Sequence, residues 1–180
     1  MKENLYTPDC VRTPSGRYVN LIDPDPDTFC IEDIAYTLSN IPRFGGRLPV
    51  YYSVAHHSLR VCGIVRGLDH ATQFQALMHD ASEAYLQDIS KPLKAHLPEY
   101  KVIETRMMER MALHFGFAWP KSKEVENADK TAMEEEWRDI MLGNPEENDF
   151  LTRAQVHKRF LHYYHRFKPT PKQFPETANP

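Results

Sequence analysis

The chain has 180 residues, about the length of one domain, and 41% of them are hydrophobic, so a core of ordinary size can form without disulfides or structural zinc. The formal charge of −3 offers no basic field for a nucleic-acid duplex, and no apolar run approaches the roughly 20 residues that span a bilayer. Three scattered cysteines favour a reducing compartment. We therefore expect a cytoplasmic protein that binds neither duplex nucleic acid nor a membrane.

The N-terminal region predicts a short β-hairpin, and the rest of the chain predicts helices. A turn at residues 13–16 (TPSG) precedes an alternating segment at 18–22. Apolar periodicity then predicts helices at residues 30–41, 53–66, 70–86, 99–116, 122–142 and 152–167, with a short helical turn after Ser90. Thr152 and Gln155 have the spacing of a capping box. We predict an all-α helical bundle with a short hairpin, one domain over residues 1–167, and a proline-rich extended tail over 168–180.

Two predicted helices carry an ionisable side chain inside the apolar stripe that should be buried. In helix 53–66 the stripe includes His57, whereas His56 points about 100° away from it. In helix 122–142 Asp129 lies in the middle of the stripe, which runs through Val125, Ala128, Ala132, Met133 and Trp137. A carboxylate in such a place must be hydrogen bonded, ion-paired or bound to a metal.

A third group of ionisable residues lies in segment 76–85 (ALMHDASEAY), which is apolar or small nearly all round and predicts a central buried helix. On a helix Glu83 is i+4 from His79 and i+3 from Asp80, so the three side chains should share one face. With His57 and Asp129 they form a set of imidazoles and carboxylates that suits divalent zinc, cobalt, manganese or iron. No cysteine belongs to the set, which argues against a structural zinc site.

The order of these residues, His57, then His79-Asp80, then Asp129, resembles the HD-domain metal-dependent phosphohydrolases. Segment 76–85, together with Asp88 and residues 91–94 (KPLK), is similar to the branch that contains deoxyribonucleoside 5′-monophosphatases. Residues 13–21, 31–35 and 43–46 also resemble phage dATP triphosphohydrolases, which clear dATP in viruses that replace adenine with 2-aminoadenine. The resemblance covers about residues 10–165, and a phage-encoded member would lie in the host cytoplasm.

The resemblance implies an HD-domain fold, one divalent metal ion (Co, Mn, Zn or Mg), a deoxynucleotide substrate and a homo-oligomer. The implied metal ligands are His57, His79, Asp80 and Asp129. The implied catalytic residues are Glu83, which orients or deprotonates the attacking water, Asp88 near the sugar and phosphate, and Arg43 at the phosphate or sugar. The implied substrate-binding residues are Arg43, Phe44, Asp88, Lys91, Pro92 and Lys94. Phe44 departs from the monophosphatases, which have tryptophan there.

The substrate and the class of activity have alternatives. We expect hydrolysis of dATP to deoxyadenosine and triphosphate, and a general deoxyribonucleoside 5′-monophosphatase is the alternative. A di-iron oxygenase would need more histidines than this set supplies, because His96 and His114 do not have the spacing expected for a second metal. A non-catalytic nucleotide-binding protein would lack a ligand or Glu83.

Two further interpretations stay open at this stage. Arg43 could form an ion pair with Glu32 or Asp33 instead of contacting substrate, and Lys91 and Lys94 could simply be solvated. A methionine-rich face of helix 99–116 fits either a homo-oligomer interface or the core. That face contains Ile103, Met107, Met111 and Phe115.

Overall fold

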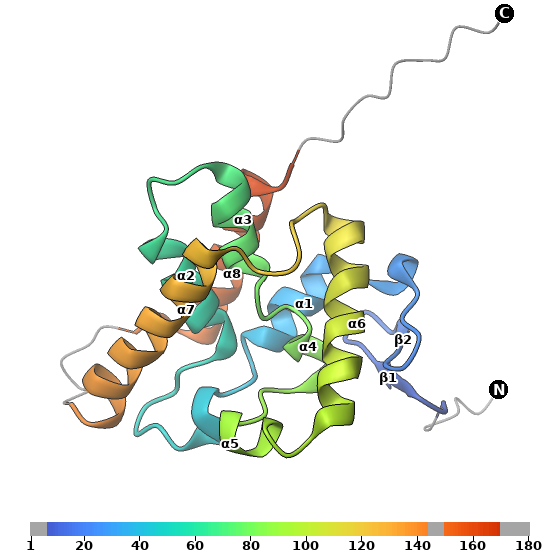
Figure 1. Ribbon diagram of the computed structural model, residues 1–180, viewed down its shortest axis with the longest axis horizontal. Coiled ribbons are helices and arrows are strands. Elements are labelled where there is room, and N and C mark those ends of the chain that lie inside the picture. The colour runs from blue at the N-terminus through green and yellow to red at the C-terminus, as the bar shows by residue number, and fades with distance from the viewer. Residues whose placement is uncertain (1–6, 144–149, 170–180) are drawn as a thin grey trace, which may run out of the picture.

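The computed structural model describes residues 7–143 and 150–169 and is mostly helical, with one small two-stranded sheet (Figure 1). The strands are β1 (Cys10–Arg12) and β2 (Tyr18–Asn20). The helices are α1 (Ile31–Leu38), α2 (Val54–Ile64), α3 (His70–Met78), α4 (Glu83–Leu86), α5 (Lys91–Lys94), α6 (Pro98–Phe115), α7 (Lys123–Glu136) and α8 (Arg153–Phe167). Short 3₁₀ turns cover Pro26–Thr28 and Arg43–Gly46. The predicted all-α class with a hairpin is confirmed; of the predicted tail, residues 170–180 lie outside the described residues.

The hairpin is antiparallel, with Val11 opposite Val19. Gly16 adopts a φ of 88° in the turn between the strands, and its amide donates to the Thr13 carbonyl at 2.9 Å. The Ser15 amide and hydroxyl both donate to the Asp33 carboxylate, at 2.9 and 2.6 Å. The hairpin is therefore fastened to the first turn of α1, and the Asp33 carboxylate is occupied by Ser15.

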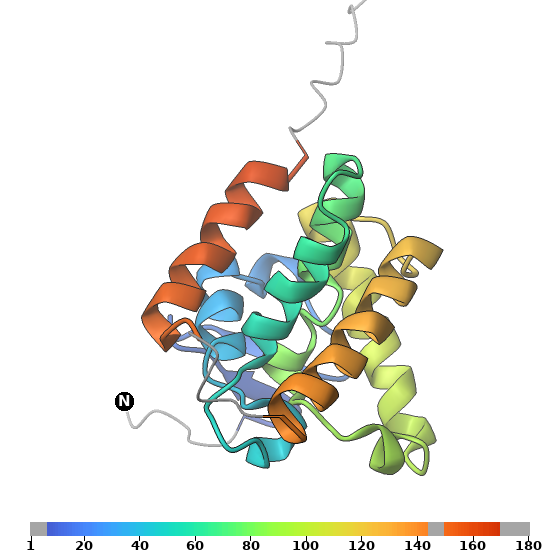
Figure 2. The same ribbon diagram turned by 90° about the vertical axis from the view of Figure 1, so that its left-hand side faces the viewer.

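Helices α2 and α3 form the centre of the bundle. Helix α2 packs against α3, α7 and α8, and α3 packs against α7 and α8 as well. Figure 2 shows α7 and α8 on opposite sides of this central pair. Because the central helices are covered on several sides, polar residues on them are buried too, and they must find partners inside the protein.

Helix α6 turns its methionine-rich face inward. Met107 and Met111 are completely buried, and Phe115 is 9% exposed. The core interpretation of this face is therefore correct, and the face leaves little apolar surface for a second copy. The homo-oligomer stays a prediction.

The predicted continuous helix 70–86 is wrong, because α3 ends at Met78 and α4 begins at Glu83. Between them the amides of Ala81 and Glu83 donate three residues back, to Met78 and Asp80, both at 3.0 Å. These bonds wind the backbone more tightly than an α-helix. The small buried Ala81 lets this tight turn pack inside the core. The regular α-helical spacing expected for His79, Asp80 and Glu83 therefore does not apply, although the three side chains still line one cavity.

The predicted helix 122–142 also changes character. Helix α7 ends at Glu136, and Trp137–Met141 form a π-helical turn in which the Leu142 amide donates to the Trp137 carbonyl at 3.0 Å. Trp137, which belongs to the predicted apolar stripe, is 48% exposed, whereas Glu136 is completely buried. Consequently a carboxylate, rather than the indole, enters the core at this end of α7.

Gly116 ends α6 in a left-handed conformation, with a φ of 80°, just before the loop that leads to α7. A Cβ there would lie 2.9 Å from Cγ of Pro169, whereas a Cβ at Gly63 in α2 meets nothing within 4 Å. We expect Gly116→Ala to lower the free energy of unfolding by about 1–2 kcal/mol. Gly63→Ala should raise it by roughly 0.5–1 kcal/mol, because alanine favours a helix over glycine. Denaturant unfolding followed by circular dichroism measures both, and changes of the same sign would contradict this interpretation.

Candidate metal centre

His57 on α2 faces Asp129 on α7 in the interior of the bundle. Its Nε2 lies 3.1 Å from Oδ1 of Asp129 and 3.7 Å from Oδ2 of Asp80. The imidazole is completely buried, and the two carboxylates are about one-fifth exposed. His56, next in the chain, points elsewhere: its Nε2 lies 2.8 Å from the Leu151 carbonyl, and its Nδ1 caps α2 with Ser53. Only one of the two adjacent histidines therefore reaches this cluster.

His79 reaches the same cluster from the tight turn after α3. Its Nδ1 lies 2.7 Å from the Ala76 carbonyl, which can only accept, so Nδ1 carries a hydrogen. Its Nε2 lies 3.1 Å from Oδ2 of Asp80 and 3.7 Å from Oδ1 of Asp129. That nitrogen is buried, yet it has no hydrogen-bond partner among the described residues. A buried ring nitrogen without a partner is what a metal ligand looks like when no ion is present.

The donor set fits a divalent ion. One ligand atom from each of His57, His79 and Asp129 lies within 4.8 Å of the others, so these three residues could hold a metal ion. Asp80 lies beside them, with Oδ2 close to both ring nitrogens. Nitrogen and oxygen donors of this kind suit zinc, cobalt, manganese and iron.

The charges of the cluster shift the pKa values of its members. Burial would raise the pKa of Asp129, but the close contacts with His57 and His79 outweigh it and hold that pKa well below its usual value. Burial would lower the pKa of His79, but the carboxylates of Asp80 and Asp129 outweigh it and raise that pKa to about 9. Without an ion, a proton on His79 therefore compensates part of the negative charge.

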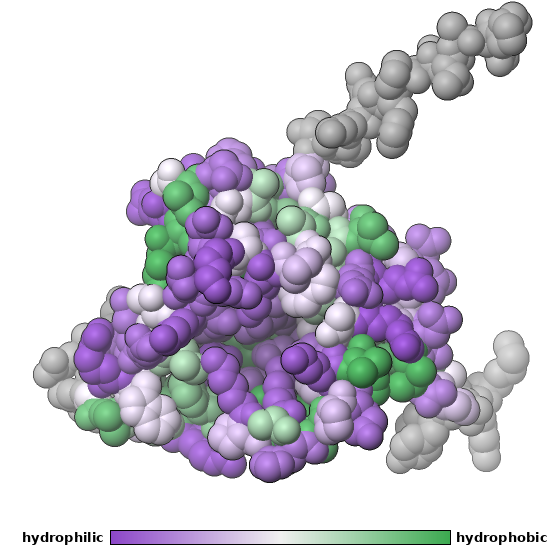
Figure 3. Space-filling model, in the orientation of Figure 1, coloured by the Kyte–Doolittle hydropathy of each residue, from purple (hydrophilic) through white to green (hydrophobic). Residues whose placement is uncertain are grey.

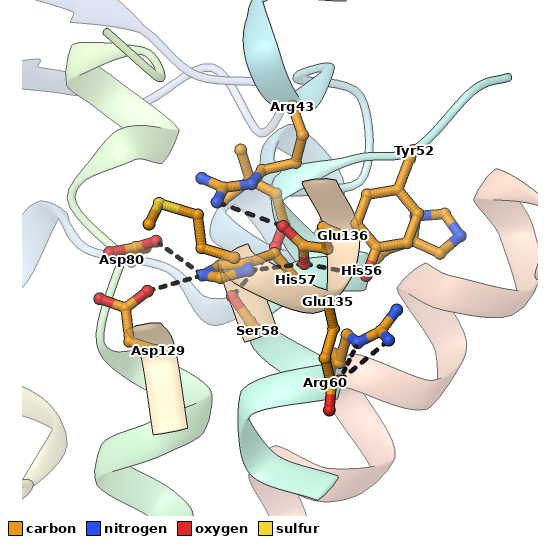
Figure 4. A network of polar contacts seen from close by, with 12 residues as sticks. Arg43, Tyr52, His56, His57, Ser58, Arg60, Asp80, Asp129, Glu135 and Glu136 are labelled. Atoms are coloured by element: carbon orange, nitrogen blue, oxygen red, sulfur yellow. Dashed lines mark hydrogen bonds and ion pairs between the residues drawn. The ribbon is translucent and has the colours of Figure 1, made fainter. Parts of the chain in front are cut away.

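Glu136 is a member of the site that the sequence prediction missed. Its Oε1 lies 2.7 Å from Nδ1 of His57 and accepts from the Tyr52 hydroxyl at 3.1 Å. Its Oε2 accepts from Arg43 at 3.4 Å (Figure 4). Burial would raise the pKa of Glu136, but the hydrogen bond with His57 outweighs it and holds that pKa below its usual value. The sequence does contain a signal for Glu136, because this residue is seven positions after Asp129 and hence on the same face of the helix.

Arg43 pairs with Asp88 and Glu136, at 3.6 and 3.4 Å, rather than with Glu32 or Asp33. Two strained residues adjoin this pair. Phe44 has a φ of 54°, and Gln87 has a φ of 70° with a ψ of 157°, a region that is almost restricted to glycine. These turns direct the Arg43 and Asp88 side chains toward each other.

Two neighbouring cavities share Arg43 in their linings. The polar cavity has a volume of about 200 Å³ and contains His79, Asp80, Glu83, Lys94, Lys121 and Asp129 in its lining. The apolar cavity has a volume of about 540 Å³, and its lining contains Phe44, Asp88, Pro92, Met133, Trp137 and Met141. Arg43 and Lys91 line both cavities. In the orientation of Figure 1 the surface is hollowed between α7 and α6, with hydrophilic side chains gathered around the hollow (Figure 3). Of the predicted metal ligands, catalytic residues and substrate-binding residues, all but His57 line one or both of these cavities, and His57 contacts Asp80 and Asp129.

The predicted base and its neighbours occupy the polar cavity. Glu83 is buried, and its Oε2 has no hydrogen-bond partner among the described residues. Burial, together with the charges of Asp80 and Asp88, raises the pKa of Glu83 well above its usual value. Lys94 is not simply solvated, because its Nζ lies 2.6 Å from Glu104 and 3.5 Å from Glu83.

Lys121 is a second residue of the site that the sequence prediction missed. Its Nζ lies 2.9 Å from Oδ2 of Asp129. It belongs to the loop before α7, which Gln75 of α3 holds by donating to the carbonyls of Ala118 and Pro120 and accepting from the Ser122 amide. No periodicity marks Lys121, because it lies outside the helix that carries Asp129.

Comparison with known proteins shows to which family this chain belongs. The uncharacterized protein YfdR of Escherichia coli K12 is 40% identical over 132 residues, which are 73% of this chain and 72% of YfdR. The chain belongs to the YfdR family. An uncharacterized protein of Rhodobacter capsulatus is 34% identical over 128 residues, 67% of this chain and 65% of that protein. No protein-family model matches the chain. Likeness to YfdR therefore supports common ancestry, and the chemistry must be argued from the site.

Within the described part of the chain, no helix has the length and apolar character required to cross a membrane.

Substitutions should separate the metal ligands from the remaining carboxylates. We expect Asp129→Asn to lose the ion, because it removes the anionic ligand between the two histidines. Glu83→Gln should keep it, since Glu83 is not one of the grouped ligands. Asp139→Asn is the matched control, because Asp139 pairs with Arg138 and Arg60. Metal content after loading with Co²⁺ and desalting measures all three; full occupancy in Asp129→Asn would refute the assignment.

The affinity for Co²⁺ should rise with pH. An ion must displace the proton from His79, whose pKa of about 9 keeps it protonated at neutral pH. Each pH unit below 9 should therefore weaken binding about tenfold, with release of a proton on binding. Isothermal titration between pH 6.5 and 8.5, in buffers of different ionisation enthalpy, measures both quantities. A flat affinity profile over this range would contradict the shifted pKa.

Proposed function

We propose that the chain is an HD-domain metal-dependent phosphohydrolase that cleaves the 5′-phosphate ester of deoxynucleotides. The observation that carries the proposal is that two cavities of different character share two basic residues in their linings. His79, Asp80 and Asp129 line the polar cavity, aromatic side chains line the apolar cavity, and Arg43 and Lys91 line both. A nucleotide has the matching chemistry, with a charged phosphate at one end and a planar base at the other.

The balance of charge in the polar cavity supports a phosphate ligand. The lining has four basic side chains and four carboxylates, which balance once an ion has displaced the proton of His79. The basic residues are Arg43, Lys91, Lys94 and Lys121, and the acidic residues are Asp80, Glu83, Glu104 and Asp129. A divalent ion leaves the cavity with an excess of positive charge that suits a phosphate dianion.

Different side chains have different roles in the proposed reaction. His57, His79, Asp80 and Asp129 would hold the divalent ion, which supplies polarisation of a phosphoryl oxygen and acidification of water. Glu83 orients the attacking water and accepts its proton, for which its buried and unpartnered Oε2 is suited. Arg43 offers a planar guanidinium for bidentate contact with phosphate oxygens.

The apolar cavity suits the nucleoside. Its volume of about 540 Å³ is typical of small-molecule sites. The rings of Phe44 and Trp137 are 6.0 Å apart between centroids, and Pro92 and Met133 complete an apolar lining. Asp88 lines the apolar cavity and lies beside Arg43, a position suited to the sugar hydroxyl.

Within this class we propose dATP as the substrate, with deoxyadenosine and triphosphate as products. Its support is the resemblance of residues 13–21, 31–35 and 43–46 to the phage enzymes. A deoxyribonucleoside 5′-monophosphatase is the second candidate. It is favoured by the 2.6 Å ion pair between Lys94 and Glu104, which leaves one cation fewer for the outer phosphates.

The experiment is a panel of nucleotides. The protein is incubated with Co²⁺ or Mn²⁺ and each of the four dNTPs, the four dNMPs and ATP, and products are resolved by chromatography. We expect triphosphate from dATP, with dGTP, dCTP and dTTP left intact. Consumption of monophosphates alone, without base preference, would support the second candidate. Absence of phosphate release from every nucleotide would overturn the hydrolase and favour a nucleotide-binding protein.

Glu83→Gln is the control variant for this panel. It should retain Co²⁺ but lose about 10²–10⁴-fold in rate, because it removes the proton acceptor while leaving the ligands. Activity equal to the unmodified protein would exclude Glu83 as the base without excluding hydrolysis.

A further inference from the structure

Glu136 is the most deeply buried charge around the site, and three different elements supply its partners. The side chain is completely buried. His57 of α2, Tyr52 of the preceding loop and Arg43 of the 3₁₀ turn all contact its carboxylate. Figure 4 shows Glu136 between Arg43 and His57, with Asp80 and Asp129 on the other side of the imidazole. A buried carboxylate in such a network needs all of its partners.

The contact with His57 determines which ring nitrogen faces the metal centre. An ionised carboxylate can only accept, so Nδ1 of His57, at 2.7 Å, carries the hydrogen. The nitrogen left to bind an ion is then Nε2, which faces Asp129 and Asp80. Carboxylates behind ligand histidines fix the tautomer and orientation of the ring in this way.

The second oxygen of Glu136 acts on a different group. Oε2 accepts from Arg43, whose other terminal nitrogen lies 3.6 Å from Asp88. The Arg43 guanidinium is therefore held between two carboxylates at the junction of the two cavities. One glutamate thus contacts both a candidate ligand of the ion and the arginine nearest the candidate phosphate site.

The end of α7 explains how a glutamate comes to this position. Glu136 is the last residue of the regular helix, and the π-helical turn begins at Trp137. At this junction Glu136 points into the core, whereas Trp137 lines the apolar cavity. π-Helical turns of this kind are frequent at functional sites.

We propose that Glu136 is a positioning residue that presents Nε2 of His57 to the divalent ion and holds Arg43 for phosphate, so that the two binding events are coupled. The proposal rests on the metal centre of the proposed function and not on the identity of the nucleotide. Its tests therefore use Co²⁺ and inorganic phosphate alone and require no turnover.

The first test compares the Co²⁺ affinities of Glu136→Gln and Glu135→Gln with that of the unmodified protein. Glu135 is the matched control, because it is adjacent and pairs with Arg60 instead of His57. We expect Glu136→Gln to weaken Co²⁺ binding about 10–100-fold and to alter the visible absorption of bound Co²⁺. Glu135→Gln should change neither. Unchanged affinity and spectrum in a folded Glu136→Gln protein would overturn the proposal.

The second test measures coupling. Co²⁺ affinity is titrated with and without inorganic phosphate in the unmodified protein, Glu136→Gln and Arg43→Gln. We expect phosphate to tighten Co²⁺ binding in the unmodified protein and to do so less in both variants. In Glu136→Gln the amide nitrogen would face the Arg43 guanidinium. Because both groups are donors, the guanidinium would no longer be held. An equal phosphate effect in the unmodified protein and Glu136→Gln would overturn the role toward Arg43.

Two further outcomes are distinguishable. If the unmodified protein binds no Co²⁺, the metal centre fails and the role of Glu136 fails with it. If Glu136→Gln does not fold, as judged by circular dichroism, Glu136→Asp replaces it, because aspartate keeps the charge but is one methylene shorter. Co²⁺ binding by folded Glu136→Asp should be weakened, and unchanged affinity and spectrum would overturn the proposal.

Discussion

The arrangement of the site depends on one buried imidazole between two carboxylates of the same helix. His57 of α2 contacts Asp129 through Nε2 and Glu136 through Nδ1, at 3.1 and 2.7 Å. The two acidic residues are seven positions apart, which is about two helical turns, so they lie on the face of α7 that meets α2. Buried charges are strongly destabilising without their partners, by about 3–5 kcal/mol when one is removed. The register of α2 against α7 is therefore held by electrostatics as well as by apolar packing.

The sequence predicted the members of this site that lie on regular helices. His57 and Asp129 interrupt apolar stripes with a period of 3.6 residues, and such interruptions are visible without a structure. Glu136 belongs to the same face as Asp129, but the predicted apolar stripe runs through Trp137 and does not include it. The π-helical turn at that point shifts the periodicity, and no glycine or proline marks it in the sequence.

The parts that escaped prediction depend on contacts between distant segments. The break between α3 and α4 covers residues 79–82, which also fit a continuous helix, so only the packing around them selects the tight turn. Likewise, the pairing of Lys121 with Asp129 requires the loop that Gln75 holds in place. Local periodicity contains no information about such contacts.

Irregular backbone is concentrated where the two cavities meet. Phe44 and Gln87 have positive φ values next to Arg43 and Asp88, the tight turn carries His79, and the π-helical turn begins at Trp137. The regular helices α2, α3 and α7 pack against one another and form the rigid framework of the site. A single helix face cannot direct two imidazoles, an arginine and several carboxylates to one point. Irregular backbone conformations are therefore expected at a site where such side chains converge. The same constraint explains why the lysines of the polar cavity pair with its carboxylates: charges brought together for a ligand must compensate one another in its absence.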